Sequence, residues 1–206
     1  MKKKPLIILI LAVTCCVLSA AENIRPPRFG AGLRLSAYGI PDALLDPFLD
    51  EYPDVNGQGV AFEIRTYGKR GPRSAFSWVF ALEYSRMQGK GEWREDSQDP
   101  LKSGEGEATQ VSATATILWH IFPSWAVHPY IGAGIGLGRM QIWAEGVYED
   151  NFGNTQRENQ RETLVVPTVH LPVGILVRLS PRVEIRLEGG FKNGFYLGGG
   201  VVYAFR

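Results

Sequence analysis

Cysteine is almost absent from this chain of 206 residues, and its two cysteines, Cys15 and Cys16, are adjacent in an early apolar segment. The sequence beyond them contains no thiol, which excludes a disulfide framework there. A dominant charge is also absent, because 22 Lys and Arg face 21 Asp and Glu. No global basic charge therefore favours nucleic acid. The longest apolar run is also shorter than the roughly 20 residues of a membrane-spanning helix.

The first 21 residues have the three parts of a cleaved signal peptide. The basic MKKK precedes the apolar PLIILILAVTCCVL, and SAA at 19–21 has the small-x-small form of a cleavage site. Removing Lys2, Lys3 and Lys4 leaves 19 basic residues against 21 acidic ones, a balance of 19 − 21 = −2. We therefore expect an exported, nearly neutral chain with a short periplasmic lead-in over residues 22–27.

Lipidation of Cys15 or Cys16 is an alternative to simple cleavage. The preceding Val13 and Thr14 fit a lipobox poorly, since small residues are usual there. The sequence leaves open whether either cysteine is ever lipidated.

Alternation with period two dominates the remaining sequence, and no long helical period occurs after residue 30. Period-two alternation of apolar and polar residues is the signature of β-strands. Eight such runs cover residues 28–38, 58–68, 75–84, 111–121, 129–140, 169–179, 182–192 and 195–205. The sequence thus predicts an all-β fold, with one barrel domain over residues 28–206.

Glycine takes every second position from Gly132 to Gly138 in PYIGAGIGLGRM (129–140). A nucleotide-binding G-x-G-x-x-G loop should follow a strand and open a helix. Here the alternation continues through the segment, and Pro129 begins it. We predict a strand whose glycines leave room for Arg, Glu and Tyr side chains inside a barrel.

Short turns and long connections alternate along the chain. The predicted long loops cover 39–57, 88–107 and 143–162, and Asn193-Gly194 suits a type I′ hairpin turn. In an antiparallel barrel this places the long loops at one end and the short turns at the other, as in outer-membrane barrels.

Side-chain volume indicates which face of the strands points outward. The apolar face carries many aromatic residues, including Phe76, Trp78, Phe80 and Trp119. An eight-stranded barrel has an interior just wide enough for side chains. The apolar set therefore faces outward, towards lipid, and the glycine-rich polar face lines the lumen.

The chain resembles the small outer-membrane β-barrels of the OmpA/OmpX type over residues 28–206. The resemblance rests on the signal peptide, the strand pattern, the alternating connections and PYIGAGIG. It implies an eight-stranded antiparallel up-and-down transmembrane β-barrel surrounded by outer-membrane lipids and lipopolysaccharide. The closing VVYAF resembles the signal read by the barrel assembly machinery, although Arg206 follows the final aromatic residue.

The predicted lumen face gathers titratable side chains of both signs. They are Arg34, Glu63, Arg65, Glu83, His120, His170, Arg178, Glu184, Arg186 and Glu188. A plug of mutually paired charges is the favoured interpretation, because buried charges are costly unless paired. A catalytic Glu/His site or a selectivity filter is the alternative. His120 and His170 have no third ligand at a recognisable spacing, so no metal or other cofactor is predicted.

Asp42, Asp46 and Asp50 are spaced four residues apart in the first long loop. This pattern is typical of a short amphipathic helical turn, with Pro47 limiting its regularity. The turn would be an ordinary solvated loop or an interfacial segment bound to lipopolysaccharide phosphates through divalent cations.

Enzyme function has little support in the sequence. Lipid A deacylases, which use similar barrels, need a His-x-Ser arrangement, and none of the three histidines has it. We therefore predict a monomeric, non-enzymatic outer-membrane barrel with a structural or surface-interaction role. The alternatives are a narrow passive channel and a lipid A-modifying enzyme; the sequence identifies no extracellular ligand.

Overall fold

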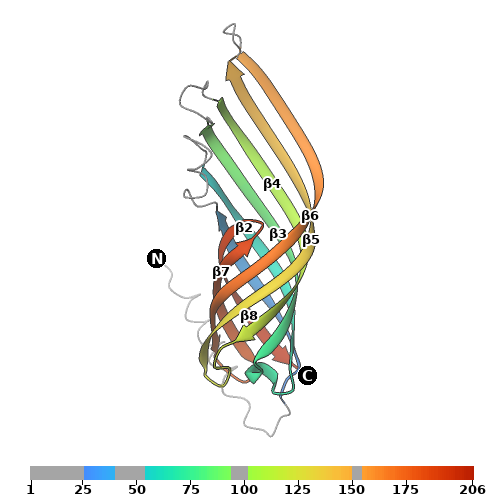
Figure 1. Ribbon diagram of the computed structural model, residues 1–206, viewed down its shortest axis with the longest axis vertical. Helices are drawn as coiled ribbons and strands as arrows, with labels where there is room; N and C mark the ends of the chain where they lie inside the picture. The colour runs from blue at the N-terminus through green and yellow to red at the C-terminus, as the bar shows by residue number, and fades with distance from the viewer. Residues whose placement is uncertain (1–25, 40–53, 94–101, 150–154) are drawn as a thin grey trace, which may run out of the picture.

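The computed structural model describes residues 26–39, 54–93, 102–149 and 155–206, which form one ring of antiparallel strands (Figure 1). Its strands are β1 (Phe29–Gly39), β2 (Asp54–Tyr67), β3 (Phe76–Trp93), β4 (Lys102–His120), β5 (Val127–Glu149), β6 (Thr155–Arg178), β7 (Val183–Lys192) and β8 (Phe195–Phe205). A short 3₁₀ helix, η1 (Gly71–Arg73), lies between β2 and β3. The prediction of an eight-stranded antiparallel up-and-down barrel is confirmed.

Closure of the ring joins the first strand to the last. Each strand pairs with the next one in the sequence, and β1 pairs with β8 from Phe29↔Phe205 to Gly39↔Phe195. Within the closed ring no strand edge is free, so the backbone groups there bond to one another without water. Among the described residues, no helix is long and apolar enough to span a membrane.

The two ends of the barrel differ. The turn end holds η1, the connections after β4 and β6, and the chain's C-terminus (Figure 1). At the other end, called here the extended end, β3 to β6 run on beyond the closed ring as a tall, twisted sheet. β6 pairs with β7 only over His170–Arg178, so residues 155–169 have a strand partner on the β5 side alone.

The prediction of long loops over 88–107 and 143–162 is wrong for most of these residues. β3 continues to Trp93 and β4 begins at Lys102, while β5 continues to Glu149 and β6 begins at Thr155. These extensions lie beyond the closed ring, so neither of their faces needs apolar residues. Their sequence is therefore polar on both faces, as in a loop. Their pairing is held by backbone hydrogen bonds and cross-strand contacts instead. Of the predicted loop 39–57, residues 54–57 belong to β2, and 40–53 lie outside the described residues.

Side chains alternate strictly between lumen and outer surface within the ring. On β3, Ser77, Val79, Ala81 and Glu83 are buried, whereas the intervening Trp78, Phe80 and Leu82 are exposed. The same pattern holds on β1, where Arg34, Ser36 and Tyr38 point inward. The prediction that the apolar set faces outward is confirmed.

The alternating glycines of β5 allow unusually close packing inside the wall. A Cβ at Gly132 would lie 2.6 Å from Leu118 Cδ2 and 2.9 Å from Pro172 Cγ. A Cβ at Gly134 would lie 2.7 Å from the carbonyl oxygen of Ala115. The strand prediction is correct, but the space is taken by the side chains and backbone of β4 and β6. The expectation that this space holds Arg, Glu and Tyr side chains is therefore wrong.

The β7–β8 connection differs from the predicted type I′ turn. Phe191 pairs with Phe195, so three residues form the loop, and the Lys192 amide donates to the Gly194 carbonyl at 2.7 Å. Only Asn193 has a positive φ there, 51°, whereas a type I′ turn needs positive φ at both central residues.

Candidate functional site: the charged lumen and the lipid-facing surface

The predicted lumen residues converge inside the ring, and nine of the ten are buried. The tenth, Arg178, ends β6 at the turn end. Its guanidinium donates to the carbonyl oxygens of Pro72 at 2.7 Å and Pro123 at 3.1 Å. Arg178 therefore ties two turns together, and its Nε lies 3.9 Å from Glu184 at the edge of the lumen.

Arg34 is the hub of the lumen network. It donates to Glu83 and, at 2.7 Å, to Glu188, and its Nε lies 3.5 Å from Glu63. Its own exposure is 0%. On the neighbouring strands Arg34 is paired with Ala61 and Gly200, two small residues that leave room for the guanidinium at the barrel axis.

Two further pairs cross the lumen between β2 and β7. Arg186 donates to Glu63, and Arg65 donates to Glu184 at 3.0 Å. In the closed ring β2 and β7 are separated by β1 and β8, so each pair ties together two strands that are not neighbours. In a low-dielectric interior, the attraction between two charges offsets the cost of removing them from water only when the partners lie this close.

Several members of this network were missed from the sequence. Lys192 donates to Glu83 at 2.6 Å, and the hydroxyls of Tyr130 and Tyr196 donate to Glu188 at 2.5 and 3.2 Å. Tyr38 donates to Glu83. The alternation itself placed these four side chains on the lumen face. Their part in the network could not be inferred from the sequence. Tyrosine is as common at a lipid interface as in a polar interior, and Lys192 lies beside a turn, where an exposed lysine is expected.

The core of the network is balanced in charge. Four cations, Arg34, Arg65, Arg186 and Lys192, face four carboxylates, Glu63, Glu83, Glu184 and Glu188, and all eight are at most 4% exposed. An isolated buried charge would be prohibitively costly, whereas a neutral, hydrogen-bonded cluster is tolerated. Among the described residues, these eight charges balance, and their pairing can brace the inside of the barrel.

Histidines join this interior at two levels. His170 accepts or donates hydrogen bonds with Thr116 at 2.9 Å and Tyr196 at 2.8 Å, in contact with Arg34. Nearer the turn end, His120 lies 2.8 Å from the Ser77 hydroxyl and 3.3 Å from His128. In the described ranges, no three His, Cys, Asp or Glu side chains are grouped to hold a metal ion.

The Ser77–His120 pair has the spacing of a nucleophile and its base, although the two residues lie on different strands and form no His-x-Ser motif. Ser77 is 2% and His120 4% exposed, inside the packed wall. A substrate cannot reach a hydroxyl so enclosed. The pair therefore acts as a polar bridge between β3 and β4.

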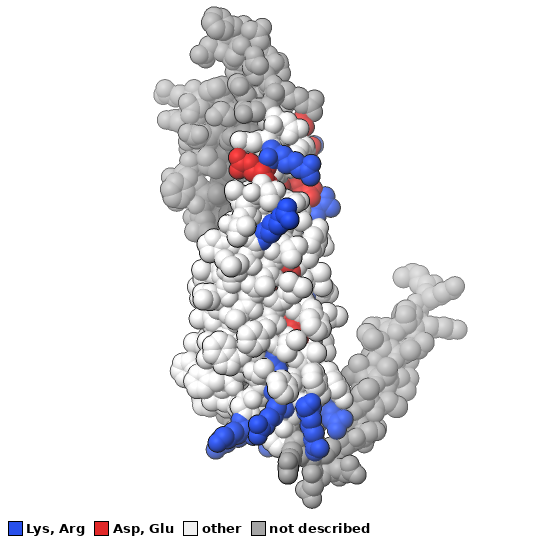
Figure 2. Space-filling model, turned by 90° about the vertical axis from the view of Figure 1, so that its right-hand side faces the viewer, with Lys and Arg blue, Asp and Glu red and all other residues white. Residues whose placement is uncertain are grey.

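The outer surface of the ring is apolar around the barrel. In the space-filling view a band with few charged atoms separates a cationic base from the mixed charges of the extended end (Figure 2). On this outer surface Ile135 is 74% exposed and Leu197 72%. Such a surface in water would be a severe aggregation liability, whereas in lipid it is the favourable one.

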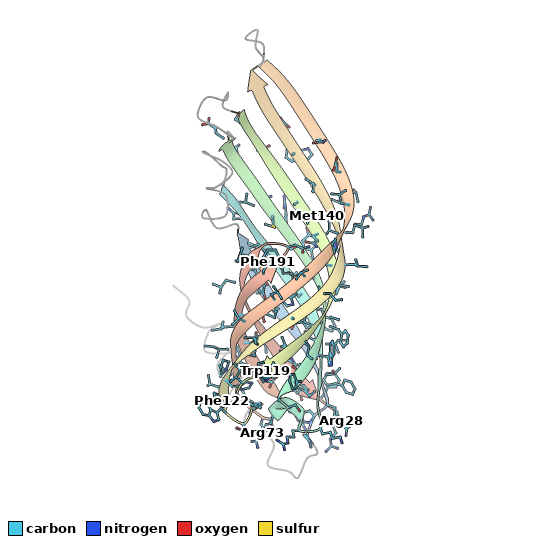
Figure 3. All side chains as sticks on the ribbon, viewed as in Figure 1. Arg28, Arg73, Trp119, Phe122, Met140 and Phe191 are labelled. Atoms are coloured by element: carbon cyan, nitrogen blue, oxygen red, sulfur yellow. The ribbon has the colours of Figure 1, made fainter. Side chains whose placement is uncertain are left out.

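Aromatic residues border this band. Seven aromatic residues near the turn end are exposed on the outer surface: Phe29, Phe76, Trp119, Phe122, Trp125, Tyr203 and Phe205. Figure 3 shows Trp119 and Phe122 close to the turns and Phe191 much higher on the wall. Towards the extended end, Tyr84 is exposed on β3 and Trp143 is half-buried on the β5 extension. Paired aromatic girdles mark the two interfaces of a membrane barrel.

The extended end carries charged cross-strand pairs on β3 and β4. Arg86 donates to Glu107 at 2.6 Å, and Lys90 lies 3.5 Å from Glu105. The hydrogen bond from Arg86 lowers the pKa of the Glu107 carboxyl. The predicted interfacial aspartates, Asp42, Asp46 and Asp50, lie outside the described residues, as does the signal segment 1–21.

Comparison with protein-family models and with curated proteins gives no match to this sequence. Several solved structures are similar to the chain. Neisserial surface protein A is 14% identical, covers 86% of this chain and 97% of its own, and has a TM-score of 0.47. The attachment invasion locus protein Ail of Yersinia pestis is 15% identical, with 85% and 95% covered and a TM-score of 0.39.

The N-terminal β-barrel domain of Pseudomonas aeruginosa OprF is 16% identical, covers 87% of this chain and 98% of its own, and has a TM-score of 0.34. The fold assignment rests on the chain's own strand pairing. By that pairing, its apolar outer face and its charged interior, the chain is an eight-stranded transmembrane β-barrel of the outer-membrane type.

Proposed function

We propose that this chain is a non-enzymatic outer-membrane protein with a closed lumen, which acts at the cell surface through the sheet formed by β3 to β6. The observation that carries the proposal is the contrast between two parts of the barrel. Its lumen is filled by a charge-balanced network, whereas its extended end projects polar, partly exposed strands beyond the apolar band.

The proposed orientation puts the turn end in the periplasm and the extended end outside. Outer-membrane barrels have short periplasmic turns and longer extracellular segments. The turns after β2, β4 and β6 are short here, and the strands of the extended end are the longest, with 23 residues in β5 and 24 in β6. Lipopolysaccharide would then surround the base of the projecting sheet.

Cysteine labelling in intact cells tests this orientation. The sequence beyond Cys16 has no thiol, so a single introduced cysteine reports one position. Gln160→Cys on exposed β6 should react with a membrane-impermeant maleimide in intact cells. Lys69→Cys in an exposed turn should react only after the outer membrane is permeabilised. The parent chain, with its signal peptide removed, serves as the unlabelled control. The opposite pattern, or no labelling of Gln160→Cys in intact cells, would refute the proposal.

Closure of the lumen predicts silence in a planar bilayer. Protein purified from membranes should give no discrete conductance steps, because paired side chains from four strands, β1, β2, β3 and β7, fill the lumen. A heat-dependent shift in gel mobility and flotation with vesicles would show that the same sample is folded and inserted. Steps that change when Glu63 and Glu184 are replaced by glutamine would establish the narrow passive channel instead.

A further inference from the structure

Positive charge is concentrated at the turn end. Seven basic side chains lie there: Arg28, Lys69, Arg70, Arg73, Arg178, Arg182 and Arg206. The described residues of this end, 26–29, 68–75, 121–127, 178–183 and 204–206, include no Asp or Glu. Figure 2 shows the base as a cluster of blue side chains, and Figure 3 places Arg28 and Arg73 there. The extended end, by contrast, mixes both signs.

A pocket of about 680 Å³ opens within this cationic surface. Five arginines contribute to its lining: Arg70, Arg73, Arg178, Arg182 and Arg206. Prolines from three segments also line the pocket, including Pro26, Pro72 and Pro181. Because the proline ring fixes the backbone dihedral φ, these parts of the wall have little conformational freedom. The pocket is thus a partly rigid hollow bordered by guanidinium groups.

These arginines have different environments. Arg178 is held by turn carbonyls, and Arg182 reaches the Tyr203 hydroxyl at 3.4 Å. Arg70, Arg73 and Arg206 make no ion pair with any carboxylate in the described part of the chain. A group of like charges without counter-charges creates a positive potential that attracts anions. Guanidinium groups match the geometry of phosphate oxygens, which they bind through paired N–H donors.

The pocket also lies at the level of the membrane interface. Tyr203 and Phe205 belong to the aromatic girdle of the turn end, and both line the pocket. An occupant could therefore place a phosphate among the arginines while its acyl chains remain beside the apolar wall. A soluble anion would make no use of this position next to lipid.

We propose that the turn-end pocket binds the phosphate headgroup of an anionic phospholipid from the adjacent leaflet. The site would fix the barrel's depth and give it an ordered lipid partner on the side opposite the projecting sheet. The proposal rests on the proposed membrane orientation, which identifies this leaflet as the periplasmic one.

Native mass spectrometry of the protein purified from membranes tests the site, using phosphatidylglycerol and phosphatidylcholine as probes. The parent protein should retain phosphatidylglycerol preferentially. The variant Arg70→Gln/Arg73→Gln/Arg182→Gln should bind phosphatidylglycerol about 100-fold more weakly. Each basic side chain near an anionic surface contributes roughly fivefold to the affinity, and the three contributions multiply. The matched control Arg86→Gln/Lys90→Gln/Arg139→Gln removes the same charge from the extended end and should retain the lipid.

Equal losses in both triple variants would overturn the proposal, since they would reflect overall charge and no specific site. Unchanged retention in the turn-end variant would also overturn it. Release of the lipid by equimolar inorganic phosphate would overturn the assignment to a lipid and indicate a site for free phosphate. Cysteine labelling reports the orientation separately, so a failure there is distinguishable from a failure of lipid binding.

Discussion

Replacing Arg34 with methionine is expected to lower the free energy of unfolding by about 3–5 kcal/mol, the range found when one partner of a buried ion pair is removed. Methionine retains much of the side-chain volume but donates no hydrogen bond. Glu83 and Glu188 would each lose a donor inside the barrel, and Glu63 would lose a nearby positive charge. Urea unfolding of the protein in phospholipid vesicles, followed by tryptophan fluorescence, measures the change.

A second substitution separates charge from packing. The buried cluster has four cations and four carboxylates, so Arg34→Met leaves three against four, and adding Glu188→Gln restores three against three. We expect the double variant to recover a large part of the lost stability, since a neutral glutamine is far less costly to bury than an unpaired carboxylate. Failure to recover would show that Arg34 acts through its shape alone.

Arg86→Met is the matched control for the same chemical change at an exposed site. Arg86 pairs with Glu107, but its side chain is 52% exposed and water can replace the lost contact. We expect a far smaller loss than at Arg34, because exposed ion pairs contribute little to stability. Similar losses at the two positions would contradict the view that the lumen network holds the barrel together.

Replacing Ile135 with arginine is expected to cost about 2–4 kcal/mol, the cost of a basic residue at the bilayer midplane of a barrel. Ile135 is 74% exposed on the outer face of β5, between the neighbouring Ala115 and Val169. In water an exposed isoleucine would tolerate this change, whereas hydrocarbon cannot solvate a guanidinium. The same vesicle unfolding experiment measures it.

Thr163→Arg provides the reference for Ile135→Arg. Thr163 is exposed on β6 in the extended sheet, where charged neighbours are common. Arginine should be accepted there with little effect on unfolding. If both arginines were tolerated equally, the apolar band would be facing water, and the membrane assignment would be wrong.

The turn-end arginines show how charge can be informative only after folding. Along the sequence they are scattered from Arg28 to Arg206 in a chain of nearly balanced charge. The barrel brings them to one end because its turns and its last strand end there. Composition and net charge therefore gave no sign of the proposed lipid site.

Local alternation was sufficient to predict the eight strands of the ring and the direction of their faces, since a period of two is a property of the backbone itself. It also placed Arg34, Glu63 and Glu188 together on the inner face. Alternation failed in the extensions of β3 to β6, where residues such as Glu105 and Gln160 are polar on both faces. There the backbone pairing, which is a non-local interaction, determines the strand.

The sequence by itself determined the class of fold, because lipid outside and a crowded interior impose opposite demands on successive residues of every strand. It could not determine which cation meets which carboxylate. Arg34 and Glu188 are 154 positions apart, and only the closure of the ring and the register between strands place them 2.7 Å apart. The tertiary structure therefore decides which charges pair. Strand register depends on pairing around the whole barrel, and no single segment of the sequence fixes it.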